Sequence, residues 1–195
     1  LFSLVGAVRE LGADPALLPG ALHRAAAAQQ SFQRELTAIG RRTLSYGRAR
    51  EIPMVVVCGS EHVIFDRCVN AGIPGILRQN GVLALPMDCH PVPGHVDAVS
   101  SVAWTDARRA IRVALAARET GDVFPLWLSS FGCGPSSFVE QVFDHLMHGY
   151  PHTCLESDGH GGTAGFVTRI QAFLHGVRQF GRRPAPTSKR RLRVI

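Results

Sequence analysis

The sequence predicts an α/β fold: a doubly wound parallel sheet of about four strands with flanking helices, preceded by a long N-terminal helical segment. From residue 54 onward, short apolar runs alternate with helix-forming stretches, as they do in strand–helix–strand units. The runs 54–57 and 123–128 are continuously apolar, which is typical of strands buried on both faces of a parallel sheet. The chain has 195 residues, 46% of them hydrophobic and 18% charged, so it can bury a large core and is not of disordered composition.

The N-terminal segment 1–50 is expected to be a helical segment and linker. Apolar residues recur at helical spacing between Leu18 and Ile39, which predicts one long helix or two over 15–47. Asp14 followed by Pro15 is a typical pair for the N-cap and first turn of a helix.

The α/β domain is expected over 51–181. Its strands are predicted at 54–57, 82–85, 123–128 and 152–155, and its helices at 69–80, 104–119, 136–148 and 163–180. Gly121, Gly149 and Gly181 follow three of these helices, as residues that end helices often do.

The high positive charge of the chain belongs to its last segment, 182–195. This segment carries six basic residues and no acidic one, and without it 15 basic residues balance 15 acidic ones. Two prolines and the absence of interleaved aromatic residues favour a solvated basic linker into a following domain over a nucleic-acid contact.

Cysteine usage and hydropathy indicate the compartment. The five cysteines are odd in number and no pair has the C-x-x-C spacing, which argues against a secreted disulfide framework and a self-contained zinc finger. No apolar run approaches the roughly 20 residues of a membrane span, and no stretch is typical of a signal peptide. We therefore expect a cytoplasmic protein with no membrane partner.

Polar residues follow each predicted strand. Parallel sheets bind ligands outside the carboxyl ends of their strands, so we expect these residues to share one edge. The candidates are Cys58 and His62 after the first strand, Asp88, Cys89 and His90 after the second, Cys133 after the third, and Glu156, Asp158 and His160 after the fourth.

The most specific motif is Phe131-Gly-Cys-Gly-Pro-Ser136. Its cysteine is expected at a helix N-terminus, where free N–H groups favour a thiolate. Three interpretations of Cys133 remain open: a metal or cluster ligand, a nucleophile, and a small buried thiol in a tight turn. Trp104 and Trp127 are expected to pack in the core, and Cys154 to lie inside a strand.

Three motifs together resemble the acyl-CoA dehydratase activase-related family, over about residues 1–180 and in the family's order. The family pattern N-F-S-C-G-P-D-S-F corresponds to Ser130-Phe-Gly-Cys-Gly-Pro-Ser-Ser-Phe138. The pattern N-x-G-I-P-x-x-L-x-x-x-G-V corresponds to residues 70–82, which begin at Asn70, a further candidate polar residue of the site. The pattern L-E-x-D-x-H-x-x-x-A-G-x-x-T-R-x-x-A-F-L corresponds to residues 155–174. The chain departs from the family in two places: Cys58-Gly-Ser-Glu-His62 replaces the family's G-R-P-Y segment, and Ser136 replaces its Asp.

The resemblance implies a domain of an activator of 2-hydroxyacyl-CoA dehydratase that supports ATP-driven one-electron transfer. The domain would bind a [4Fe-4S] cluster through Cys133, Cys89 and Cys58. Its expected partner is a dehydratase-type protein or further domains of the same polypeptide, and it could also form a homo-oligomer. We find no ATP-binding pattern, and we expect the chain to be a piece of a longer protein whose ATPase portion precedes it.

Two other functions stay open. In one, the chain is a thiol-dependent acyl-CoA transferase or hydrolase with Cys133 as nucleophile, His160 or His90 as base, and the backbone N–H groups of 133–136 as oxyanion site. In the other, it is a non-catalytic docking domain. Iron and acid-labile sulfide in the anaerobically prepared protein would favour the redox function over the other two. An acyl adduct on Cys133 would favour the transferase or hydrolase.

Overall fold

The computed structural model describes the chain except residues 1, 95, 97–101, 158–161 and 182–195. Its centre is a parallel sheet of four strands in the order β2-β1-β3-β4. The strands are β1 (Met54–Cys58), β2 (Leu83–Pro86), β3 (Val123–Ser130) and β4 (Thr153–Ser157). β1 and β3 are buried almost throughout, as their uninterrupted apolar sequences require.

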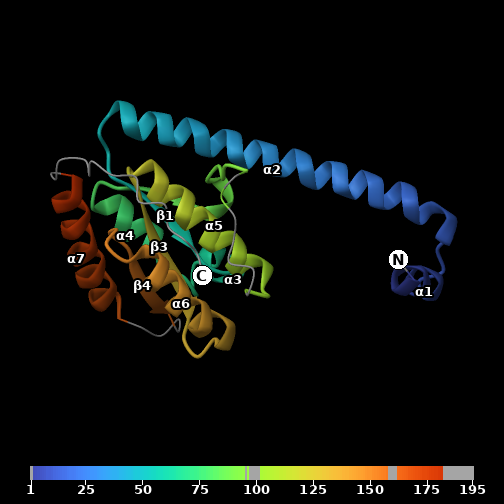
Figure 1. Ribbon diagram of the computed structural model, residues 1–195. Helices are drawn as coiled ribbons and strands as arrows, with labels where there is room; N and C mark the ends of the chain where they lie inside the picture. Colours follow the sequence, from blue (N-terminus) through green and yellow to red (C-terminus); the bar gives the residue numbers. More distant parts are fainter. Residues whose placement is uncertain (1, 95, 97–101, 158–161, 182–195) are drawn as a thin grey trace.

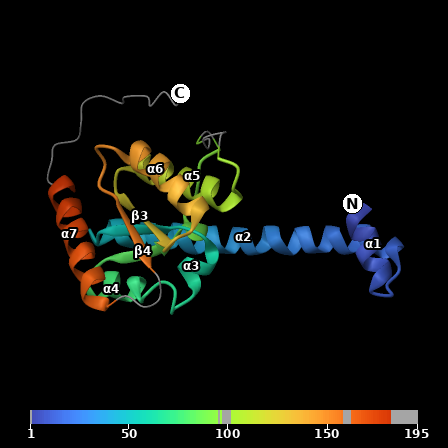
Figure 2. The same ribbon diagram turned by 90° about the horizontal axis from the view of Figure 1, so that it is seen from below.

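Helices cover both faces of this sheet, as Figure 2 shows. Helices α5 (Thr105–Thr120) and α6 (Gly134–Met147) pack together on one face. Helices α3 (Glu61–Phe65) and α4 (Ile73–Gln79) lie on the other face, and α7 (Thr163–Gly181) packs beside α4. The core between these layers includes Phe143 of α6 and Ile170 of α7, neither of which is exposed.

The strand order contains a topological switch point between β1 and β3. The chain leaves β1 toward β2 on one side, through α3 and α4, and it leaves β3 toward β4 on the other side, through α6. The two crossovers therefore diverge and leave a crevice at the carboxyl ends of β1 and β3, which is where open α/β sheets bind ligands.

The N-terminal helices form an arm that closes the β2 edge of the sheet and then extends beyond it (Figure 1). The arm consists of α1 (Phe2–Glu10), the 3₁₀ turn Pro15–Leu17 and the long helix α2 (Leu18–Ala49). Glycines bring α2 close to its neighbours. A Cβ on Gly40 would lie 1.7 Å from the carbonyl oxygen of Cys89, and one on Gly47 would lie 2.4 Å from the sulfur of Met54.

The predicted fold class is confirmed, and all four predicted strands are present within two residues of their expected ends. The helix expected over 69–80 is shorter in the structure, because Gly72 takes a left-handed conformation (φ 69°) and α4 begins only after it. Helix α1 lies within the expected helical segment 1–50, whereas α3 and the 3₁₀ turn η2 (Met87–Cys89) were not predicted, since segments this short carry little periodicity. Among the described helices, none is both long and apolar enough to cross a membrane.

Candidate functional site

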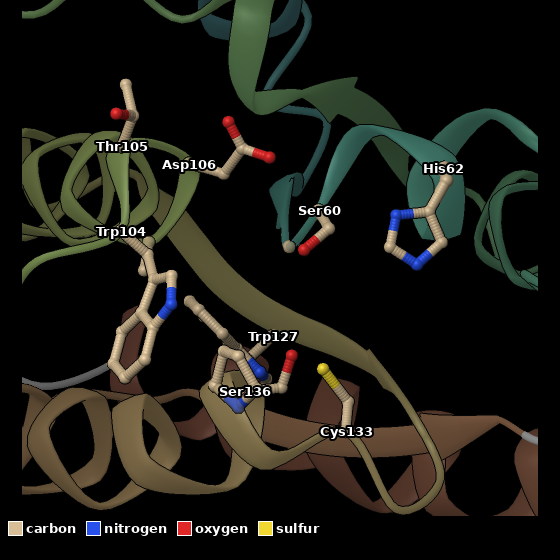
Figure 3. A pocket seen from close by; sticks show the side chains of 11 residues that line it. Ser60, His62, Trp104, Thr105, Asp106, Trp127, Cys133 and Ser136 are labelled. Atoms are coloured by element: carbon tan, nitrogen blue, oxygen red, sulfur yellow. The ribbon is translucent and has the colours of Figure 1, made fainter.

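A pocket of about 340 Å³ occupies the crevice at the switch point (Figure 3). Three segments surround it: the turn after β1 with Ser60 and His62, the start of α5 at residues 104–107, and the turn from β3 into α6 with Cys133 and Ser136. Trp127 of β3 also lines it. The N-termini of α5 and α6 thus face one cavity, and their unpaired N–H groups favour a negatively charged ligand atom there.

The turn after β1 depends on Gly59. Its φ is +150°, which side-chain-bearing residues rarely adopt, and a Cβ would lie 2.1 Å from the carbonyl oxygen of Leu128 on β3. The glycine therefore lets the chain leave β1 tightly against β3 and places Ser60 and His62 at the pocket.

Cys133 is the N-cap residue of α6, as the sequence predicts. Pro135 sits in the first turn of the helix, where its missing N–H costs nothing. The pKa of the Cys133 thiol is lowered, chiefly by hydrogen bonding from the hydroxyl and then from the backbone N–H of Ser136. The thiol is partly exposed and lines the pocket. This combination of access and a favoured thiolate is typical of reactive cysteines.

Trp127 contributes an unusual group to the same pocket. The side chain is 2% exposed and its ring packs against Phe143, with centroids 5.5 Å apart. Within the described part of the chain, no hydrogen-bond acceptor meets its indole Nε1. A buried N–H donor without a partner costs about 1–3 kcal/mol.

The residues after β2 lie away from the pocket. Asp88 is buried on η2 and forms an ion pair with Arg109 of α5 (2.8 Å), which also donates to Gln33 of α2 (3.0 Å). Cys89 is buried where α2 packs against η2. His90 is also buried, and burial lowers its pKa so that it is held neutral. These residues join α2 to the sheet domain and do not line the pocket.

The remaining predicted site residues are dispersed. Cys58 is fully buried at the end of β1, and burial raises its pKa. Asn70 is buried and holds the turn before α4, donating to the carbonyl of Ile64 (2.9 Å) and accepting from the N–H of Gly72 (2.9 Å). Glu156 is exposed on β4. Asp158, His160 and the basic segment 182–195 lie outside the described residues.

The three cysteines expected as cluster ligands, Cys133, Cys89 and Cys58, differ in their access and in the pKa of their thiols. All five lie in the described part of the chain, and burial raises the pKa of Cys58, Cys89 and Cys154, the last to about 12. Among the described residues, no three His, Cys, Asp or Glu side chains are grouped to hold a metal ion. Of the three cysteines expected as ligands, only Cys133 has a lowered pKa.

An exposed aromatic rim includes one residue of the pocket lining, Trp104. We use this name for Phe131, Trp104 and Phe138, which are 73%, 44% and 55% exposed. Trp104 precedes α5 and meets Phe138 of α6 edge to face, with ring centroids 5.9 Å apart. Phe131 lies in the turn that leads to Cys133. Exposed aromatic side chains gathered beside a cavity are typical of interaction surfaces.

Sequence reasoning missed the contribution of the tryptophans and of Ser136 to the pocket. Trp127 is buried, as expected, but it also lines the cavity, and Trp104 is exposed at the rim. One signal for Trp104 exists in the sequence: it is the first residue of the predicted helix 104–119, and helices that follow strands begin at the carboxyl edge of a parallel sheet.

The comparisons with known proteins agree with the expected resemblance. Residues 2–89 match the family model described as a CoA enzyme activase uncharacterised domain, so the resemblance to the acyl-CoA dehydratase activase-related family is confirmed for this part of the chain. The match covers the arm, β1 and the segment through η2, including the motif at 70–82, and it ends before Cys133. The comparisons with curated proteins and with solved structures found no match.

Proposed function

We propose that this chain is a partner-docking domain of a CoA enzyme activase, and that it meets a 2-hydroxyacyl-CoA dehydratase-type protein through the aromatic rim. The match of residues 2–89 supports the activase part of this proposal. The single observation that carries the docking part is the rim itself, three exposed aromatic side chains of which Trp104 lines the pocket and Phe138 meets Trp104 edge to face.

The rim has the composition of an interface centre. Aromatic residues are enriched where two proteins bury each other, and a few of them carry most of the binding free energy. The three side chains of the rim are aromatic, so their contribution to the contact would depend on apolar burial.

One-electron transfer to that partner belongs to the same proposal. The cysteines limit how many ligands of a cluster this chain would supply. A [4Fe-4S] cluster needs four ligands, and Cys133 is the one thiol of the expected set with access and a favoured thiolate. A cluster at this edge would therefore take its other ligands from another chain or from another domain of the same polypeptide. Hydrolysis of ATP would be the task of the activase ATPase portion.

The test is binding between the full-length activase polypeptide and a purified 2-hydroxyacyl-CoA dehydratase, measured anaerobically by biolayer interferometry. The double variant Phe131→Ser, Phe138→Ser is expected to weaken binding at least about 30-fold, since interface aromatics contribute about 2 kcal/mol or more each. Phe32→Ser is the matched control, because Phe32 is also aromatic, is 54% exposed and lies on α2. Unchanged binding of the double variant, or equal weakening by the control, contradicts the proposal.

Cluster binding is tested separately by an iron and acid-labile sulfide assay. The isolated 195-residue chain, reconstituted anaerobically, is expected to hold no cluster, whereas the complex with the partner is the form in which iron should appear. A stable cluster in the isolated chain that survives Cys133→Ala would contradict the role given to this thiol.

A further inference from the structure

We propose that two copies of this chain associate through the long helix α2, which pairs with its counterpart in antiparallel orientation. This association uses a different surface from the docking function, since the aromatic rim belongs to the sheet domain and not to the arm. The occupant of the exposed apolar face of α2 is therefore a second copy of the chain.

The first half of α2 projects beyond the sheet domain. The buried residues of this helix are Gly40, Leu44 and Gly47, and all three belong to its second half. Figures 1 and 2 show the sheet domain and α1 at opposite ends of the helix, with a long stretch of it between them. Most helical stability in proteins comes from packing of an apolar face, so an amphipathic stretch of this kind favours a partner.

Apolar side chains follow α2 at a seven-residue period. Phe32, Ile39 and Tyr46 are seven residues apart and are all exposed. The same spacing continues toward the N-terminus at Ala25 and Leu18. A second row, four residues along from the first, consists of Leu22, Gln29, Leu36 and Thr43. We call these two rows the α2 seam. A seven-residue repeat keeps one face against a neighbouring helix over many turns, so the occupant of the seam is itself an α-helix.

The charges of the arm favour the antiparallel orientation. Residues 34–49 contain four arginines and one glutamate, whereas 18–33 contain one arginine and no acidic residue. A parallel pair would bring two basic halves side by side, where like charges repel. An antiparallel pair sets each basic half beside the tip of the other copy's arm, residues 2–17, which carries two acidic residues and one arginine.

Side-chain sizes along the α2 seam suit a two-fold axis near residue 27. About this axis, Phe32 lies opposite Leu22 of the other copy, and Leu36 lies opposite Leu18. The four alanines 25–28 fall at the centre, where small side chains let two helices approach closely. Both copies offer the same surface about such an axis, so the assembly is closed at two chains.

The same arrangement keeps the two sheet domains apart. Gly40 marks the domain end of each helix, where it packs against Cys89. At 1.5 Å per residue, the two Gly40 residues lie about 40 Å apart. A domain of about 130 residues has a radius of gyration of about 14 Å, so both domains fit. Leu11 and Leu17, which are exposed at the tip, come toward the domain end of the other copy's helix, where Ile39 is also exposed.

The first experiment measures the association of the full 195-residue chain by sedimentation equilibrium. Wild type is expected to be dimeric at about 100 µM. Phe32→Glu is expected to raise the dissociation constant of the dimer at least about 100-fold, because the two-fold axis buries the new charge twice in one interface.

Phe65→Glu is the matched control, because Phe65 of α3 is 56% exposed and Phe32 is 54% exposed. This control is expected to remain dimeric. Phe32→Glu leaves the aromatic rim of each copy intact, so its binding to the dehydratase is expected to persist, which separates the two surfaces. A monomeric wild type, a dimer that Phe32→Glu leaves intact, or equal weakening by Phe65→Glu overturns the proposal.

The second experiment tests the orientation by crosslinking single introduced cysteines with a short bis-maleimide. Ala28→Cys lies beside its counterpart in the antiparallel pair and is expected to give a covalent dimer. Ile39→Cys lies about 36 Å from its counterpart in that pair and beside it in a parallel one, so it is expected to give none. Both are made in a Cys68→Ser background, which removes an exposed thiol, and this background alone is the control. Crosslinking through Ile39→Cys, or none through Ala28→Cys, overturns the antiparallel pair.

Discussion

Replacing Gly40 with alanine tests the close contact between α2 and η2. The added Cβ would lie 1.7 Å from the carbonyl oxygen and 2.6 Å from the carbonyl carbon of Cys89. Ordinary contacts need about 3.5 Å, so α2 would have to move by roughly 1.5–2 Å. Both clashing atoms belong to the backbone and cannot rotate away, which puts the cost at the upper end of about 1–3 kcal/mol for overpacking.

The helix propensity of alanine offsets about 1 kcal/mol of this cost. We therefore expect Gly40→Ala to lower the free energy of unfolding by about 2 kcal/mol, and the melting temperature by about 4–8 °C. Urea denaturation followed by circular dichroism measures the change.

Gly20→Ala on the same helix is the matched control. Its Cβ would meet only the end of the Arg24 side chain, at 3.4 Å. The control is expected to be neutral or stabilising by up to about 1 kcal/mol. If both variants show the same stability, α2 does not pack against η2 as described, and the reasoning fails.

Three further predictions concern buried polar groups and the pocket thiol. Arg109→Met should leave the buried Asp88 carboxylate without its cation and cost about 3 kcal/mol in urea denaturation, and the double variant with Asp88→Asn should recover most of it. Asn70→Ala removes two hydrogen bonds in the turn before α4 and should cost about 2 kcal/mol; a change under about 0.5 kcal/mol contradicts this. Ser136→Ala should raise the pKa of Cys133, because it removes the hydroxyl that chiefly lowers it, so iodoacetamide should react more slowly near neutral pH and the midpoint of its pH–rate profile should move upward. An unchanged midpoint would exclude this role of the hydroxyl.

The type and position of the strands and helices had clear sequence signals where an element is long and strongly patterned. The uninterrupted apolar residues of β1 and β3 could be recognised because a strand buried on both faces has no polar side. Cys133 could be placed at a helix N-terminus because Pro135 follows it and prolines favour the first turn.

The placement of the residues after β2 could not be predicted from the sequence. Asp88 and Cys89 follow β2 as predicted, but the 3₁₀ turn η2 directs them against α2 and α5. The packing of α2 against η2 sets the direction of these side chains. The contact between Gly40 and Cys89 joins residues far apart in the chain. No local pattern in the sequence encodes that contact.

The sequence by itself determined the α/β class, the arm that precedes the sheet, and the position of the Gly–Cys–Gly turn at the carboxyl end of a strand, because these follow from periodicity and from local backbone preferences. Only the tertiary structure decided which edge residues share a pocket. It brought Cys133, Ser136 and Trp127 together and buried Cys58 and Cys89 elsewhere. The physical reason is that strand order and helix packing, which depend on contacts between distant segments, set which turns meet at the switch point.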